Sequence, residues 1–246
     1  MLDISIGWFR KEKWFYDKPR PGDMFGLNIY RQCSLNKDLP GFHRQPFHTK
    51  IIALDKADEQ TLLNNFPEET RYEIRRAERD GVVCSSENDP DRFISFFNRF
   101  AETKKLYPIR KKIYFRDKSC FLITKASAGK EDLVMHSYIL DPQGKRARLL
   151  QSASLFRKEQ DPGRRSLTGR ANRLLHYHDM VILKKSGVRL YDVGGYAKET
   201  TNRELRQINN FKDELGGVMV EESDYIPLIL GLIYKSKNIL SGWKRT

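Results

Sequence analysis

The second half of the sequence alternates strand-like and helix-like segments, and glycines mark several of the places where a segment ends. Two apolar segments, 133–140 and 147–156, flank the turn sequence Asp-Pro-Gln-Gly at 141–144, which is typical of a β-hairpin. Further along, the hydrophobic periodicity predicts a helix at 169–186, a strand at 188–193, a helix at 202–215 and a strand at 218–221. A chain with this order belongs to the α/β (α+β) class. We expect a mixed, mostly antiparallel sheet with helices packed on it.

The first half is less regular. Its first fifty residues are aromatic, basic and rich in turn formers, and they predict short strands, with a clearer strand at 48–54. A helix is expected from residue 58 to residue 80 with a break at Pro67, followed by a strand at 82–85 and a helix at 91–106. Because no linker rich in proline, glycine or serine interrupts the chain, we expect one compact unit.

Composition narrows the class of protein. The chain has 246 residues, of which 39% are hydrophobic and 31% charged, so it can bury a core and is neither disordered nor embedded in a membrane. The formal net charge is +13, and such a surface favours anionic partners: nucleic acid, phosphorylated small molecules or an acidic lipid face.

Cysteine usage and apolar runs bear on location. The three cysteines are far apart in the sequence, which argues against a disulfide framework and predicts a reducing cytoplasm. Charged residues within the first ten positions leave no apolar segment long enough for a signal peptide. The apolar run at 225–234 is too short to span a bilayer core about 30 Å thick. Followed by lysines, it could contact an acidic membrane surface at the inner face of the membrane, or pack on the protein itself.

A basic segment between the hairpin and the helix predicted at 169–186 is the first candidate site. Free N–H groups and the positive end of the helix dipole favour an anion there, and Gly169 would let a phosphate approach the backbone. The side chains that could add charge or hydrogen bonds are Arg164, Arg165, Ser166, Thr168, Arg170 and Arg173. The alternative is a solvated basic loop in which Thr168 is an ordinary N-cap.

Lys212 is the second candidate. In the helix predicted at 202–215 it is seven residues after Leu205, so it projects from the face that carries Leu205, Ile208 and Leu215. A lysine on an apolar face either extends its ammonium to the rim or points into a cleft, where it could stabilise an oxyanion.

Asp192 is the third candidate. It stands near the carboxyl end of a predicted strand, before Gly194 and Gly195, where α/β sheets place ligands, although a simple turn would explain it equally well. His178 falls among apolar residues of its helix and is expected to be a hydrogen-bonded core histidine rather than a base. His176 points elsewhere, and no metal-binding pattern is present, so no metal is expected.

Four short motifs occur in order: RxxIRRAxxxG at 71–81, ANxLL at 171–175, YDxGG at 191–195 and FKxxxGG at 211–217. Together they resemble the Fem-type aminoacyl/acyltransferase family of the GNAT (Gcn5-related N-acyltransferase) superfamily, over roughly residues 50–222. The resemblance implies a GNAT-like sheet with flanking helices. It also implies an abbreviated GNAT-like half at 1–90 and an acyltransferase half at 91–246.

The resemblance further implies transfer of an acyl or aminoacyl group to an amine. Phe211 and Lys212 match the family's Phe-Lys pair, whose lysine is associated with the transferred carbonyl. Residues 169–172, Gly169, Arg170, Ala171 and Asn172, resemble the end of the acyl-CoA pyrophosphate motif, but Ser166 replaces its arginine or glutamine.

These observations lead to one expected function and two alternatives. The first is an N-acyltransferase that moves an acyl group from acyl-CoA to an amino sugar or a similar small-molecule amine, as in cell-surface polysaccharide synthesis. Lys212 would stabilise the oxyanion and Asp192 would orient the amine or accept its proton. The alternatives are a transferase that uses aminoacyl-tRNA on a peptidoglycan precursor, and a nucleic-acid-binding module without catalysis, which the basic run at 104–118 would suit.

Overall fold

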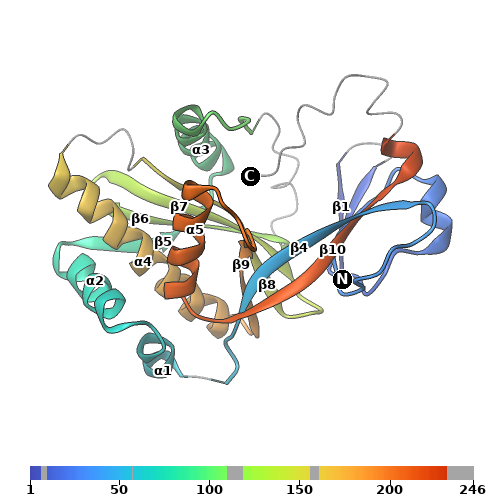
Figure 1. Cartoon of the computed structure of the whole chain (residues 1–246). Coiled ribbons are helices and arrows are strands. Elements are labelled where there is room, and N and C mark those ends of the chain that lie inside the picture. The colour runs from blue at the N-terminus through green and yellow to red at the C-terminus, as the bar shows by residue number, and fades with distance from the viewer. Residues whose placement is uncertain (7–9, 57, 110–118, 156–160, 232–246) are drawn as a thin grey trace. The chain divides into compact units, whose positions relative to one another are not determined.

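The computed structural model describes residues 1–246 except 7–9, 57, 110–118, 156–160 and 232–246 (Figure 1). It divides into two compact units, one formed by Met1–Thr49 with Met219–Thr246 and the other by Lys50–Val218. The chain enters the second unit within strand β4 (Phe42–Ala53) and leaves it within strand β10 (Val218–Pro227). The boundary expected near residue 90 falls inside the second unit, so the structural division differs from the one implied by the sequence.

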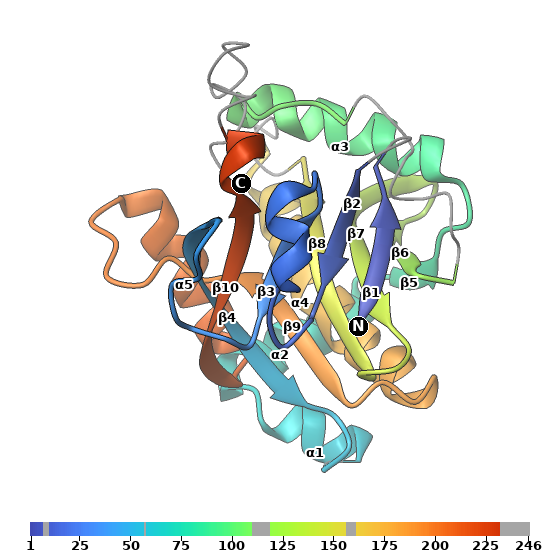
Figure 2. The same ribbon diagram turned by 90° about the vertical axis from the view of Figure 1, so that its right-hand side faces the viewer.

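The first unit is built on five strands. Their order is β1 (Leu2–Ser5), β2 (Lys11–Trp14), β3 (Ile29–Cys33), β10 and β4. Strands β1 and β2 are antiparallel and lie side by side in Figure 2, whereas β2 and β3 are parallel. A short 3-10 helix, η1 (Pro21–Phe25), separates β2 from β3. The expected short strands are thus present.

The second unit contains the larger core. Its strands run in the order β9 (Leu190–Gly195), β8 (Arg146–Ser154), β7 (Glu131–Asp141), β6 (Phe121–Ala128) and β5 (Val82–Ser86), with β4 beside β9. All neighbours from β5 to β8 are antiparallel, and β8 and β9 are parallel. The mixed, mostly antiparallel sheet and the hairpin of β7 and β8 are confirmed, while β6 was not predicted.

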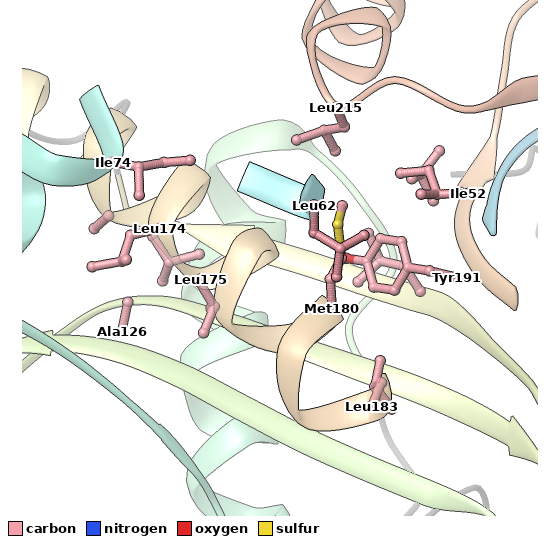
Figure 3. Packing of buried hydrophobic residues seen from close by; sticks show 14 of the residues in the cluster. Ile52, Leu62, Ile74, Ala126, Leu174, Leu175, Met180, Leu183, Tyr191 and Leu215 are labelled. Carbon is pink, nitrogen blue, oxygen red and sulfur yellow. The ribbon is translucent and has the colours of Figure 1, made fainter. Parts of the chain in front are cut away.

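Among the described residues of the second unit, five α-helices accompany this sheet: α1 (Glu59–Asn64), α2 (Glu68–Arg79), α3 (Pro90–Lys104), α4 (Pro162–Lys185) and α5 (Arg203–Glu214). Side chains alternate across β7, so Val134 and Met135 join different hydrophobic clusters. The Val134 cluster includes residues of α1, α2 and α4 (Figure 3), and the Met135 cluster is filled by phenylalanines of α3. Helix α3 therefore covers the face opposite α1, α2 and α4.

One predicted helix start was wrong. Helix α4 begins at Pro162, not near Gly169, because Asp161 caps it by accepting a 2.9 Å hydrogen bond from the N–H of Gly163. Proline suits the first helical position, since it has no N–H to satisfy. Helix α5 starts where expected, and Asn202 caps it by accepting a hydrogen bond from the N–H of Glu204 at 2.9 Å.

The C-terminal apolar run begins inside strand β10. Its start, Tyr225 to Pro227, belongs to β10, where Tyr225 and Ile226 are buried. Within the described part of the chain no helix is both long and apolar enough to cross a membrane. The lysines that follow the run lie outside the described residues, so membrane contact stays a prediction.

Candidate active site

The parallel strands β8 and β9 separate after a short pairing. They are in register at Arg146 with Leu190 and at Arg148 with Asp192, after which β8 continues to Ser154 along β7. Gly194 marks the point of separation: its φ is +77°, and a Cβ there would lie 2.9 Å from the carbonyl oxygen of Leu149. Only glycine tolerates both the backbone conformation and the contact. The end of β9 thus carries a Gly-Gly turn that a larger residue would disrupt.

Lys212 of α5 reaches this turn. Its ammonium donates a 2.5 Å hydrogen bond to the carbonyl oxygen of Gly195, and its Nζ lies 3.9 Å from where a Cβ of Gly194 would be. The side chain is half-buried. Burial, with the positive charge of Arg148, lowers the pKa of Lys212 to about 8, against the opposing effect of Asp192. Lys212 is therefore mostly charged at neutral pH but held close to deprotonation.

Two further side chains of α5, Asn209 and Asp213, bind the helix to the loop that follows β9 and to β4. The side-chain amide of Asn209 donates to the carbonyl oxygen of Ala197 at 2.8 Å and accepts from its N–H at 3.1 Å. Asp213 accepts from Lys50 of β4 at 2.7 Å and from the hydroxyl of Tyr196 at 3.1 Å. These bonds hold Lys212 at a defined position relative to β9.

The apolar face predicted for α5 is only partly buried. Leu215, just after the helix, is buried, whereas Leu205 and Ile208 are 40% and 41% exposed. Phe211, which precedes Lys212 in the helix, places its ring 5.5 Å from that of His176 and 5.4 Å from the guanidinium of Arg173. We call Lys212, Phe211, Gly195 and His176 the Lys212 site.

Asp192 has a different environment from the one expected of a proton acceptor. It is fully buried and accepts from Arg146 through Nη2 at 2.5 Å and Nε at 3.2 Å. Its other oxygen accepts from the N–H of Gly194 at 2.8 Å. Both oxygens are thus engaged in holding the β8–β9 junction, which is the arrangement of a structural carboxylate.

The residues predicted to bind an anion lie within α4 rather than in a loop. Arg164 pairs with Glu131, Arg170 with Asp80 at 2.7 Å, and Arg173 with Glu214 at 2.8 Å. These three arginines therefore already face carboxylates.

The other predicted anion ligands also have partners inside the second unit. Thr168 donates to the carbonyl oxygen of Arg164 at 3.0 Å, and Ser166 accepts from Arg170 at 2.7 Å. Ala171 is buried in the core, and the side-chain oxygen of Asn172 contacts His136 Nε2 at 2.9 Å. Gly169 is an interior helical residue, and a Cβ there would meet only Arg173, 3.9 Å away. Arg165 is exposed. No backbone cradle forms at 166–172.

A buried polar network joins β7, α4 and β9, and it was not predicted from the sequence. Asp179 of α4 accepts from the hydroxyl of Tyr138 at 2.6 Å, from His136 Nδ1 at 2.8 Å and from Thr124 at 3.0 Å. Tyr138 also contacts Tyr191 at 2.9 Å. The signal was present in the sequence as polar residues among apolar ones in segments that otherwise read as core.

His176 joins the network through Tyr191, whereas His178 lies at its edge with Nδ1 3.6 Å from Oδ1 of Asp179. His176 is 2% exposed and its Nδ1 lies 2.7 Å from the hydroxyl of Tyr191, whereas His178 is half-buried. Helix α4 buries residues on several sides, so its apolar stripe did not identify the inward histidine. Among the described residues, no group of His, Cys, Asp and Glu side chains could hold a metal ion.

Comparison with solved structures shows the fold. FemX superimposes with a TM-score of 0.57 at 15% identity, over 85% of this chain and 68% of that one. The chain has the fold of FemX. The C-terminal domain of a protein assigned as a lysylphosphatidylglycerol synthetase from Agrobacterium fabrum superimposes with a TM-score of 0.60 at 11% identity, over 99% and 87% of the two chains.

L-PGS from Bacillus licheniformis has the same fold, with a TM-score of 0.56 at 12% identity over 94% of this chain and 84% of that one. No family model and no curated protein matches the sequence. The structural likeness confirms the resemblance of fold that the four motifs implied.

Proposed function

We propose that the protein is an aminoacyltransferase that moves an aminoacyl group from tRNA to a nucleophilic acceptor, with Lys212 as its oxyanion stabiliser. The observation that carries this proposal is the position of Lys212, half-buried and bonded to Gly195 where β8 and β9 separate. The names of the similar structures, FemX and a lysylphosphatidylglycerol synthetase, support this class of reaction.

The chemistry of Lys212 suits acyl transfer. Attack on an ester carbonyl places negative charge on the carbonyl oxygen, and a fixed cation in a partly desolvated site stabilises that charge. An ammonium has three N–H donors, and Gly195 is its hydrogen-bond partner among the described residues. The remaining donors can bind the oxyanion while the bond to Gly195 keeps the ammonium in place.

The choice of tRNA over acyl-CoA rests on two observations. The segment that resembles a pyrophosphate motif is helical and offers no anion cradle, and Arg164, Arg170 and Arg173 in and beside it pair with carboxylates. Helix α2, in contrast, presents one exposed row at helical spacing: Tyr72, Arg75, Arg76 and Arg79, with the Arg79 guanidinium 6.0 Å from the Tyr72 ring centroid. Arginines with an accessible aromatic ring suit an RNA backbone and its bases.

The acceptor can be an amine or a hydroxyl. An amino sugar or other small-molecule amine, a peptidoglycan precursor and a lipid headgroup all supply such a nucleophile. A lipid or a membrane-linked precursor would place the protein at the inner face of the membrane, in agreement with the cytoplasmic location and the peripheral contact expected from the sequence.

A ligand panel tests the donor. Thermal unfolding is followed with aminoacyl-tRNA, uncharged tRNA, acetyl-CoA, a long-chain acyl-CoA and CoA. A ligand present at about 100 times its dissociation constant should add about 2.7 kcal/mol to the free energy of unfolding. We expect stabilisation by tRNA and none by CoA. Stabilisation by an acyl-CoA alone would instead support the acyl-CoA-dependent amino-sugar acyltransferase. Binding of both charged and uncharged tRNA without any transfer of the aminoacyl group would support a nucleic-acid-binding module.

A further inference from the structure

Acyl transfer to an amine or hydroxyl releases a proton, and the residue expected to accept it, Asp192, has both oxygens engaged. The buried relay formed by Asp179, Tyr138, Tyr191 and His176 offers another acceptor. Its members come from α4, β7 and β9, and all lie within the second unit.

The ionised state of Asp179, at the buried end of the relay, fixes the direction of each hydrogen bond in it. Burial would raise the pKa of Asp179, but hydrogen bonds from His136 and other neighbours outweigh it and lower that pKa, so the carboxylate is ionised and can only accept. The hydroxyl of Tyr138 therefore donates to Asp179 and spends its one hydrogen. The contact between the two tyrosines then requires Tyr191 to donate to Tyr138.

His176 completes the chain. Because Tyr191 has spent its hydrogen on Tyr138, the 2.7 Å contact with His176 requires His176 Nδ1 to donate. Burial above all, and also the positive charges of His136, Lys212 and Arg173, hold the pKa of His176 well below its usual value despite Asp179. A neutral imidazole has one N–H, and here Nδ1 carries it, so Nε2 is left with a free lone pair.

The ring of His176 lies close enough to Lys212 for the positive charge of that lysine to contribute to its lowered pKa. Nδ1 points to Tyr191 in the core, and the ring packs 5.5 Å from Phe211, the neighbour of Lys212. Nε2 of His176 has no hydrogen-bond partner among the described residues. An Asp-to-His chain that fixes one tautomer and leaves the other nitrogen bare is the arrangement by which a histidine acts as a general base.

We propose that Nε2 of His176 is the general base of the transfer reaction, held in the Nδ1–H tautomer by the chain from Asp179 through Tyr138 and Tyr191. This role rests on the proposed function. As the acceptor nitrogen or oxygen forms its bond to the carbonyl carbon, its proton passes to Nε2. When the tetrahedral intermediate collapses, the bond from the carbonyl carbon to the donor's ribose oxygen breaks, and the proton passes from Nε2 to that oxygen.

The tautomer can be tested without any substrate. In the ¹⁵N spectrum of histidine-labelled protein at pH 7, we expect His176 to show a protonated Nδ1 and an unprotonated Nε2. His176→Phe assigns the signals. Tyr191→Phe removes one hydroxyl and should abolish this single tautomer. A protonated Nε2 in the wild-type protein, as the other tautomer or as an imidazolium, would overturn the proposal whatever the activity proves to be.

Kinetics test the catalytic role. His176→Phe keeps a ring beside Phe211 but removes the base, so kcat should fall by about 10²–10⁴-fold with KM for the donor little changed. Tyr191→Phe should give a smaller loss in kcat, and His43→Asn, an exposed histidine of the first unit, should change nothing. A folded His176→Phe protein with wild-type kcat would exclude the general base while leaving the proposed function intact. Failure of the wild-type protein to transfer from any donor would instead reject the proposed function, and the general base with it.

Discussion

Lys212 and Gly195 are joined by a 2.5 Å hydrogen bond from the ammonium of α5 to the last carbonyl of β9. The bond links the turn after β9 to the helix that carries the cation. Because β8 and β9 have separated at this level, the cation lies at the end of a strand rather than inside the sheet. A change that moves the turn therefore also moves the cation.

Gly194→Ala should both destabilise the protein and reduce transfer. A Cβ would sit 2.9 Å from the Leu149 carbonyl at a φ of +77°, so the turn and Gly195 must move. Gly187→Ala is a matched control, since Gly187 has a φ of +87° with nothing within 4 Å of its Cβ position. We expect about 1–2 kcal/mol for the control, from the left-handed conformation alone, and clearly more for Gly194→Ala. Equal losses in urea unfolding would contradict the close packing of the junction.

Asp192→Asn should act on stability rather than on chemistry. It removes the negative charge from the buried ion pair with Arg146, and breaking such a pair by neutralising one partner costs about 3–5 kcal/mol. The double variant Arg146→Met with Asp192→Leu removes both charges and should recover much of that loss. At a temperature where Asp192→Asn is folded, its kcat should stay within a few-fold of the wild type. A loss of kcat as large as that of Lys212→Met would return Asp192 to the mechanism.

The pH dependence of turnover should report the depressed pKa of Lys212. The ammonium loses its proton as the pH rises through about 8, so kcat should decline on the alkaline side from that pH. Lys212→Arg should keep its remaining activity to higher pH, because a guanidinium stays charged. A profile of the wild-type enzyme that is flat to pH 10 would show that the charge of Lys212 is not used.

The lowered pKa of Lys212 also predicts how the free energy of unfolding depends on pH. The dependence is opposite to that of a lysine in an ordinary ion pair, whose pKa is raised. Between pH 8 and 10.5 the unfolded chain keeps the Lys212 proton while the folded protein has lost it. Stability therefore rises with pH across this window, and below it the buried charge is a constant cost. Urea unfolding of wild type and Lys212→Met at pH 7.5 and 9.5 should show the wild type gaining on the variant. A difference that does not change with pH would contradict the depressed pKa.

Replacing the arginine row of α2 should weaken tRNA binding through its electrostatic component. In the double variant Arg75→Ala/Arg79→Ala, the log of the association constant should fall less steeply with the log of the salt concentration. The slope should be smaller in magnitude by about 0.7–0.9 for each tRNA phosphate that the variant no longer neutralises. Lys145→Ala, an exposed lysine at the turn between β7 and β8, is the control and should leave the slope unchanged. Equal slopes for all three proteins, measured by filter binding, would place the tRNA elsewhere.

The sequence predicted the hairpin, the strand before Gly194-Gly195 and the helix with Lys212 because these elements follow local rules of periodicity and turn chemistry. It misplaced the start of α4 because Pro162 and its Asp161 cap lie within a polar, arginine-rich segment that looks like a loop. The side chains of that segment were predicted to bind an anion, whereas in the fold two of its arginines pair with carboxylates from distant parts of the sequence.

The buried relay could not be predicted from the sequence for a different reason. Tyr138, His176 and Asp179 come from two elements, and only the packing of α4 on β7 brings them together. Residues of α4 are buried on several sides, so a single apolar stripe could not tell His176 from His178. Contacts between elements that are far apart in the sequence leave no recognisable pattern within the sequence of either element.

The central claim is that Lys212 stabilises the oxyanion of aminoacyl transfer, and one measurement tests it most directly. Single-turnover transfer from saturating aminoacyl-tRNA to the acceptor is compared for wild type and Lys212→Met, a change that keeps the apolar length of the side chain. We predict a rate about 10²–10³ lower with unchanged tRNA affinity, and a melting temperature equal to the wild type or higher because a partly buried charge is gone. A folded Lys212→Met protein that transfers at the wild-type rate would contradict the account.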